Sequence, residues 1–313
     1  MPTSPLRSLI LAASRNHKLR DVVAQAPVTR DVVTRFVAGE TVGDAIATTK
    51  ELADQGLLST VDRLGEDVLD ESDAAQTVRD YLELLDAVAD NGLASHVEVS
   101  VKLSAVGQAL PNSGYDIALA NARTICERAS AVGTTVTLDM EDHTTTNSTL
   151  DSARHLRTDF PWLGVVLQAY LHRTEADVAA VAYQGSRVRL CKGAYNEPTD
   201  VAFASRTEVD KSYVRCLRAL LESPAKALIA THDPRMIDIA SSLIARQRRS
   251  ADTYEFQMLH GVRPAEQRRL VEDGHQVRVY VPYGADWYGY MMRRMAEKPA
   301  NLALFLRSLT SRS

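Results

Sequence analysis

The sequence has little that would tie it to nucleic acid or to a disulfide framework. Among its 313 residues, 36 lysines and arginines are outnumbered by 40 aspartates and glutamates. No excess of positive charge therefore supports binding to a phosphate backbone. The three cysteines, Cys126, Cys191 and Cys216, form no C-x-x-C pair, and an odd number argues against paired disulfides. We therefore expect a reduced, cytoplasmic protein that binds no nucleic acid.

Long hydrophobic runs and the common nucleotide motifs are also missing. The apolar run 9–13 is too short for the core of a signal peptide, and nothing approaches the roughly 20 residues that span a bilayer. Any membrane contact is therefore expected to be peripheral. The chain has no G-x-S-x-G, no P-loop and no G-x-G-x-x-G after a strand, so a Rossmann dinucleotide site is unsupported.

A recurring unit is present instead, in which a short apolar strand with polar residues at its end precedes a helical stretch. Helices are predicted at 74–90, 115–132 and 202–221. Eight alternations predict an α/β fold, a (β/α)8 barrel over 57–313, with a doubly wound open sheet as the alternative. Residues 1–56 are expected to form an N-terminal helical arm, with helices at 20–38 and 43–54. The predicted strands are 58–63, 97–103, 134–140, 164–170, 187–192, 226–231, 253–259 and 276–281.

Alternation within these strands predicts which side chains point into the barrel. In 97–103 the valines and leucine share one face, while Glu98, Ser100 and Lys102 share the other. Helices cover the outside of a barrel, so the polar face is expected to point to the axis. Barrel active sites lie at the carboxyl ends of the strands, so a site is favoured over mutually satisfied interior groups. The polar residues expected there are Lys102, Asp139, Gln168, Arg189, Thr231, Gln257 and Tyr280.

Three motifs at strand ends carry candidate chemistry. In RLCKGAYNEP (189–198), Gly193 allows either a close approach to a ligand or a turn with positive φ. THDP (231–234) and LDMEDH (138–143) contain metal-ligand residue types, but their geometry gives no metal prediction. Lys102 and Lys192 resemble Schiff-base lysines, although an interior ion pair between Glu98 and Lys102 explains the first without chemistry.

The segment 280–298 concentrates aromatic and cationic residues. On a helix that starts near Ala285, Tyr290 can face the same way as Arg293 and Arg294. Two guanidinium groups suit a carboxylate, so this helix predicts a pocket for a small amphipathic acid. The alternative is a solvated arginine pair bonded to Glu297.

At these residues the sequence closely resembles the monofunctional bacterial members of the proline dehydrogenase family. The resemblance implies a distorted eight-fold barrel that holds FAD without a Rossmann domain, with the last helix over the barrel mouth. The fused aldehyde dehydrogenase of bifunctional relatives is expected to be absent. The matching segments are VSVKLSA (99–105), TLDMEDH (137–143), LQAY (167–170), RLCKGAY (189–195), ATHD (230–233), EFQMLHG (255–261) and YVPYG…YMMRR (280–294).

The resemblance also implies a reaction, in which L-proline becomes 1-pyrroline-5-carboxylate, a hydride passes to the flavin and quinone reoxidises it. Asp139 is expected to orient Tyr280 or Lys102, and Arg189 to stabilise the reduced flavin. A gate between Arg189 and Glu66 is a weaker implication, and Cys191 departs from the usual aliphatic residue. The implied substrate contacts are Lys102, Tyr195, Leu259, Tyr280, Tyr290, Arg293 and Arg294. The implied FAD contacts are Met140, Gln168, Arg189, Lys192, Gly193, Ala194, Thr231 and His232.

Two other functions remain open on the residues alone. A Schiff-base aldolase would use Lys102 or Lys192, and a non-catalytic protein would bind small carboxylic acids without turnover. A pyrroline-5-carboxylate dehydrogenase is a further partner that the resemblance suggests. Composition and periodicity predict a barrel with a polar mouth, and they do not predict flavin, proline or quinone.

Overall fold

Eight parallel strands close into a barrel in this computed structural model, which describes residues 35–291. Each strand pairs with the next in chain order, and β8 pairs with β1 to complete the ring. The predicted barrel is thereby confirmed, and the open sheet is excluded. The strands are β1 (Leu58–Arg63), β2 (Val97–Val101), β3 (Val136–Leu138), β4 (Gly164–Gln168), β5 (Arg187–Cys191), β6 (Lys226–Ala230), β7 (Tyr254–Leu259) and β8 (Val277–Tyr283).

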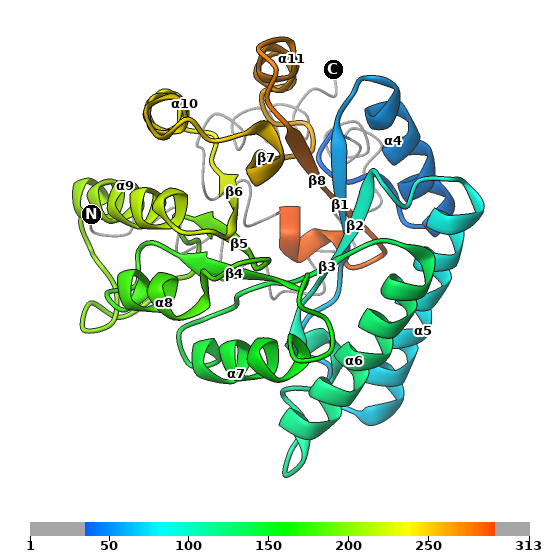
Figure 1. Ribbon diagram of the computed structural model, residues 1–313. Helices are drawn as coiled ribbons and strands as arrows, with labels where there is room; N and C mark the ends of the chain where they lie inside the picture. The colour runs from blue at the N-terminus through cyan, green and yellow to red at the C-terminus, as the bar shows by residue number, and fades with distance from the viewer. Residues whose placement is uncertain (1–34, 292–313) are drawn as a thin grey trace, which may run out of the picture.

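Helices surround the barrel, as Figure 1 shows. Predicted helix 74–90 begins earlier, at Glu71, because the Asp70 side chain caps it by accepting from the Asp73 backbone N–H. Predicted helix 202–221 begins later, at Arg206, because Ala202 forms a β-bridge with Leu171. The helices are α4 (Val42–Asp54), α5 (Glu71–Asp90), α6 (Gly114–Val132), α7 (Thr146–Leu156), α8 (Thr174–Val181), α9 (Arg206–Glu222), α10 (Pro234–Gln247) and α11 (Pro264–Glu272).

The N-terminal arm is described only from residue 35. Predicted helix 43–54 is α4, which packs against β1 and β8 on the outside of the barrel. Of predicted helix 20–38, residues 20–34 lie outside the described part and 35–38 form a turn and an irregular stretch. The division of the chain at residue 56 stays a prediction.

The core has the predicted division between an apolar exterior and a polar axis. Val97, Val99 and Val101 on β2 are fully buried in the hydrophobic core. Arg189 on β5 reaches across the axis to Glu98 on β2 and to Gln257 on β7. Hydrogen bonds between strands that are not neighbours require these side chains to lie inside the ring.

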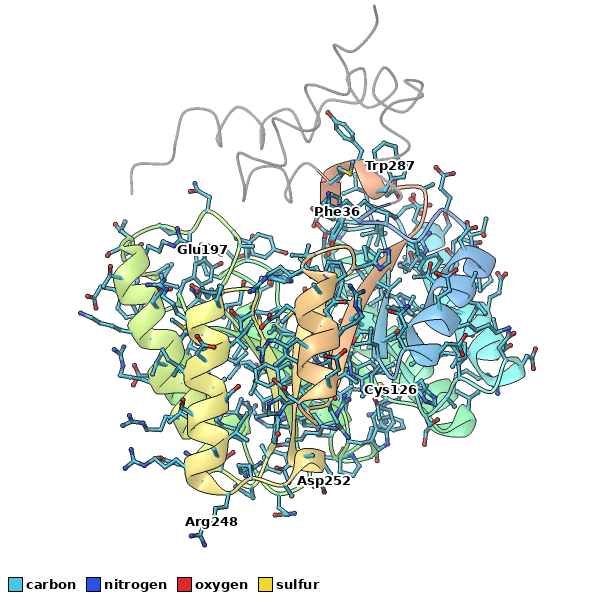
Figure 2. The ribbon with its side chains drawn as sticks, turned by 90° about the horizontal axis from the view of Figure 1, so that it is seen from above. Phe36, Cys126, Glu197, Arg248, Asp252 and Trp287 are labelled. Carbon is cyan, nitrogen blue, oxygen red and sulfur yellow. The ribbon has the colours of Figure 1, made fainter. Side chains whose placement is uncertain are left out.

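The carboxyl ends of the strands form one end of the molecule. Figure 2 shows Trp287, Phe36 and Glu197 at this end, with Arg248 and Asp252 at the opposite end. After β8 a helical turn over 287–291 lies above the centre of the barrel (Figure 1). The predicted helix near Ala285 thus starts at residue 287, and its continuation lies outside the described residues.

Candidate active site

Asp139 is the centre of a hydrogen-bonded cluster at the barrel mouth. It follows β3 directly, and its backbone N–H donates to the Val101 carbonyl (2.9 Å), which fixes the carboxylate beside β2. Ser100 Oγ and Arg189 Nη1 donate to Oδ1 at 2.6 and 2.7 Å. Tyr280 OH donates to Oδ2 at 2.7 Å. The expected pairing of Asp139 with Tyr280 is therefore present, and all three bonds use Asp139 as an acceptor.

Tyr280 is held as a neutral phenol. Burial and the adjacent Asp139 carboxylate raise the pKa of Tyr280 well above its ordinary value. The Arg189 guanidinium lies over the ring, 5.5 Å from its centroid, in a cation–π contact. The ring is thus fixed from its edge by a carboxylate and from its face by a cation.

Arg189 forms the floor of this cluster. Burial alone would lower the pKa of Arg189, but Asp139 and Glu98 outweigh burial and raise it. Its Nε donates to Gln257 Oε1 at 2.5 Å, and its Nη2 donates to Glu98 at 3.2 Å. A permanent positive charge is therefore held beneath the mouth.

Lys102 is paired with Asp62, and the predicted pair with Glu98 is wrong. Its Nζ lies 2.8 and 2.7 Å from the two Asp62 oxygens and 3.9 Å from Asp139. Glu98 lies four residues earlier in the chain, which is roughly 13 Å along an extended strand. Asp62 and Asp139 raise the pKa of Lys102 well above its ordinary value, although burial opposes this. The side chain is therefore an ammonium group.

Glu98 belongs to a second charged cluster nearer the amino ends of the strands. It is bonded to Arg187 and Arg189, and Arg278 Nε lies 3.8 Å away. Arg278 also donates to Glu255 at 2.6 Å. Burial opposes ionisation of Glu98, but these arginines hold its pKa well below the ordinary range.

The structure shows one of the two features considered for Gly193, the turn with positive φ. Its φ is +106°, and a Cβ there would lie 2.3 Å from the Tyr170 ring. The close approach that requires glycine is therefore to Tyr170. Lys192 Nζ lies between Asp210 (2.5 Å) and Asp233 (2.9 Å), so its charge is balanced. Tyr195 packs against the small cluster of Tyr170, Leu171 and Ala202.

The ends of β6 and β7 are joined by His232. Its Nε2 accepts from the Leu259 backbone N–H at 2.8 Å, which places the ring proton on Nδ1. Thr231 Oγ1 accepts from the Asp233 backbone N–H at 3.1 Å. These contacts hold Leu259, a predicted substrate contact, at the mouth.

Some of the remaining predicted residues lie within the described part of the chain, and others lie outside it. Met140 and Gln168 are buried, and Gln168 Nε2 donates to the Glu141 carbonyl at 2.8 Å. Tyr290 is buried in the turn over 287–291. Arg293 and Arg294 lie outside the described residues. Glu66 lies 4.0 Å from Lys102 Nζ, and its gate with Arg189 stays a prediction.

Two buried carboxylates at the mouth were missed by the sequence reasoning. Asp62 could have been found, because Thr60 and Asp62 alternate with Ser59 and Val61 on β1. Glu141 accepts from Ser104 Oγ (2.6 Å) and the Ser104 N–H (3.1 Å). Burial raises the pKa of Glu141 to about 7 despite these two bonds. Within residues 35–291 no group of three or more ligand-type side chains could hold a metal ion.

Comparison with known proteins identifies the family of this chain. The family model described as proline dehydrogenase matches residues 45–306. Proline dehydrogenase 1 of Bacillus subtilis subsp. natto is 38% identical over 304 residues, 97% of this chain and 99% of that protein. Proline dehydrogenase of Deinococcus radiodurans is 38% identical over 281 residues, 89% of this chain and 90% of that protein.

A solved structure supports the fold alone. Proline utilization A from Bdellovibrio bacteriovorus covers 97% of this chain with a TM-score of 0.81, at 23% identity and over 39% of its own length. Similarity of sequence along nearly the whole length, rather than of a single motif, shows that this chain belongs to the proline dehydrogenase family.

Proposed function

We propose that this protein is an FAD-dependent proline dehydrogenase, which oxidises L-proline to 1-pyrroline-5-carboxylate and passes the electrons to a quinone. The observation that carries the proposal is Tyr280, which is fixed between Asp139 and Arg189 at the mouth of a barrel from this family. The reaction is the first step in the degradation of proline to glutamate. FAD would supply the hydride acceptor for the carbon–nitrogen oxidation.

The described side chains suit the zwitterion of a small imino acid. Lys102 has three N–H donors, of which Asp62 engages two, so the remaining donor can meet the substrate carboxylate. Arg293 and Arg294 would add two guanidinium groups to the same carboxylate. Tyr280, Leu259, Tyr195 and Tyr290 would enclose the apolar ring.

The strand ends that were predicted to bind FAD fit such a group. Gly193 and Ala194 would bring main chain to the cofactor, and Thr231 would offer its hydroxyl proton, because its oxygen already accepts from the Asp233 backbone N–H. His232 lies at the same rim, held by its bond to the Leu259 backbone N–H, and Arg189 would provide positive charge. Lys192 neighbours these groups with its ammonium neutralised, and Met140 and Gln168 complete the set.

The aldolase alternative is not favoured. A Schiff base forms from a neutral amine, whereas Lys102 is bonded to Asp62 with Asp139 3.9 Å away, and Lys192 is bonded to Asp210 and Asp233. Asp62 and Asp139 raise the pKa of Lys102, which opposes the neutral form. A binding protein without turnover is distinguished from the enzyme by the experiment below.

Quinone and a pyrroline-5-carboxylate dehydrogenase are the further partners that we propose. A quinone partner would require contact with the membrane surface, and no helix within residues 35–291 has the length and apolar character to cross a bilayer.

An absorption spectrum tests the proposal. The purified protein, supplied with FAD, should be yellow, and L-proline added without oxygen should bleach its flavin bands. The flavin absorption should return when a soluble quinone is added. A protein that binds L-proline without bleaching is the non-catalytic alternative, and a protein that takes up no flavin contradicts the proposal.

A further inference from the structure

A buried carboxylate lies in the loop between β5 and α9, outside the cluster around Asp139. The Glu197 side chain is only 3% exposed, although Asn196, Pro198, Thr199 and Asp200 beside it are exposed. Burial of a charge in an exposed loop is costly unless hydrogen bonds compensate it. Figure 2 shows Glu197 at the same end of the molecule as Trp287.

Glu197 makes three hydrogen bonds to two other elements. The His143 backbone N–H and Tyr170 OH donate to its Oε1, each at 3.0 Å. The His143 ring is bonded through Nδ1 to Oε2. Oε1 therefore accepts two bonds and Oε2 is bonded to the His143 ring, so both oxygens of Glu197 have a partner. His143 follows β3, and Tyr170 follows β4, so one side chain joins three strand ends.

The bonded residues support the part of the loop that carries predicted site residues. The Tyr170 ring lies directly beneath Gly193, and its backbone N–H donates to the Lys192 carbonyl at 2.9 Å. Tyr195 packs against the cluster that contains Tyr170. The far end of the loop is tied by the Leu171–Ala202 bridge. Between these two ties, Glu197 is a side-chain anchor two residues after Tyr195.

We propose that Glu197, bonded to His143 and Tyr170, is a positioning residue that holds Tyr195 and the 193–195 main chain at the barrel mouth. The inference rests on the proposed function, because it assigns these groups to binding of L-proline and FAD. Loss of the anchor leaves the chemical cluster around Asp139 unchanged and lets the loop move. The expected consequence is weaker binding rather than slower chemistry.

Glu197→Ala is the decisive variant, measured in the flavin-loaded enzyme. We expect KM for L-proline to rise about 5- to 20-fold while kcat changes by less than about threefold. Glu197→Gln should restore most of the loss, because an amide keeps one acceptor oxygen and can donate to the other tautomer of His143. Glu208→Ala is the matched control, since its carboxylate pairs with Lys211 on the exposed side of α9.

Hydrogen–deuterium exchange gives a second readout that needs no turnover. The backbone N–H groups of His143, Val201 and Ala202, which donate to Glu197 and to the Pro198 carbonyl, should exchange about tenfold faster in Glu197→Ala than in Glu208→Ala. An unchanged KM with unchanged exchange overturns the inference. If Glu197→Ala does not fold, Tyr170→Phe and His143→Ala decide, and wild-type KM in both overturns it. Wild-type enzyme that oxidises no L-proline overturns the proposed function itself, a result visible without any variant.

Discussion

The two charged clusters on the barrel axis use the same residue types for different purposes. In the cluster around Glu98, three arginines surround one carboxylate, and the pKa of Glu98 is held well below its ordinary range. At the mouth, Asp139 accepts bonds from a phenol and a guanidinium, and Lys102 keeps a donor beyond its pair with Asp62. The dense ion pairing at the base serves stability, although Arg187 Nη1 has no hydrogen-bond partner there, whereas the mouth keeps a Lys102 donor for a ligand.

The largest expected effect comes from breaking the base. Arg278→Met removes the guanidinium that donates to both Glu255 oxygens and leaves that carboxylate with Lys226 Nζ at 3.4 Å. We expect the free energy of unfolding in urea to fall by about 3–5 kcal/mol, because a fully buried carboxylate loses its guanidinium partner. Arg123→Met is the control, since its pair with Asp159 is largely exposed and should contribute about 1 kcal/mol or less. Equal losses in both variants would contradict the buried cluster's role.

The next effect separates two lysines that both lie at strand ends. Lys102→Met should raise KM for L-proline by about 30- to 1000-fold, because a buried charged contact with the carboxylate is lost. Lys192→Met should leave KM within about threefold of wild type, since two carboxylates, Asp210 and Asp233, lie at hydrogen-bond distance and neutralise this ammonium, whereas Lys102 has only Asp62 at that distance. Steady-state kinetics at one pH provide the comparison. A large rise in KM for Lys192→Met alone would reverse the assignment.

A third prediction concerns how the stability of the protein depends on pH through Glu141. Burial raises its pKa to about 7 in the folded protein, above the ordinary value of an unfolded chain. The folded state therefore binds this proton more tightly, so stability is present below about pH 4.5 and is lost as the pH rises through 7. We expect wild type to lose about 2–3 kcal/mol more than Glu141→Gln over this range in urea titrations. Parallel pH curves would show that Glu141 is ionised throughout.

Much of this arrangement could be predicted from alternation along the strands. A period of two assigns Asp139, Arg189 and Tyr280 to the axis, and closure of a barrel then brings residues 141 positions apart into contact. The partner of Lys102 could not be predicted in this way. It depends on which neighbouring strand end a long side chain reaches. Lys102 reaches Asp62 on β1 rather than Glu98 on its own strand, β2.

The loop after β5 was harder to predict for a different reason. Glu197 lies among exposed residues with no periodic pattern, so its burial follows only from the meeting of His143 and Tyr170 in space. Gly193 was recognised as special, but the ring beneath it belongs to a different strand end. Loop conformation is set by such tertiary contacts rather than by local sequence.

If the mouth cluster, and not the base, supports the chemistry, removing one hydroxyl group from each should have different effects. Two matched tyrosines allow this comparison. Tyr280 OH donates to Asp139 at the mouth, and Tyr254 OH is bonded to His275 at the start of β7, near the base (2.8 Å). The measurement is the anaerobic rate at which L-proline bleaches bound flavin in Tyr280→Phe and Tyr254→Phe. We expect the bleaching rate to fall about 10- to 30-fold in Tyr280→Phe and to stay within about twofold of wild type in Tyr254→Phe. Equal rates in the two variants would contradict it.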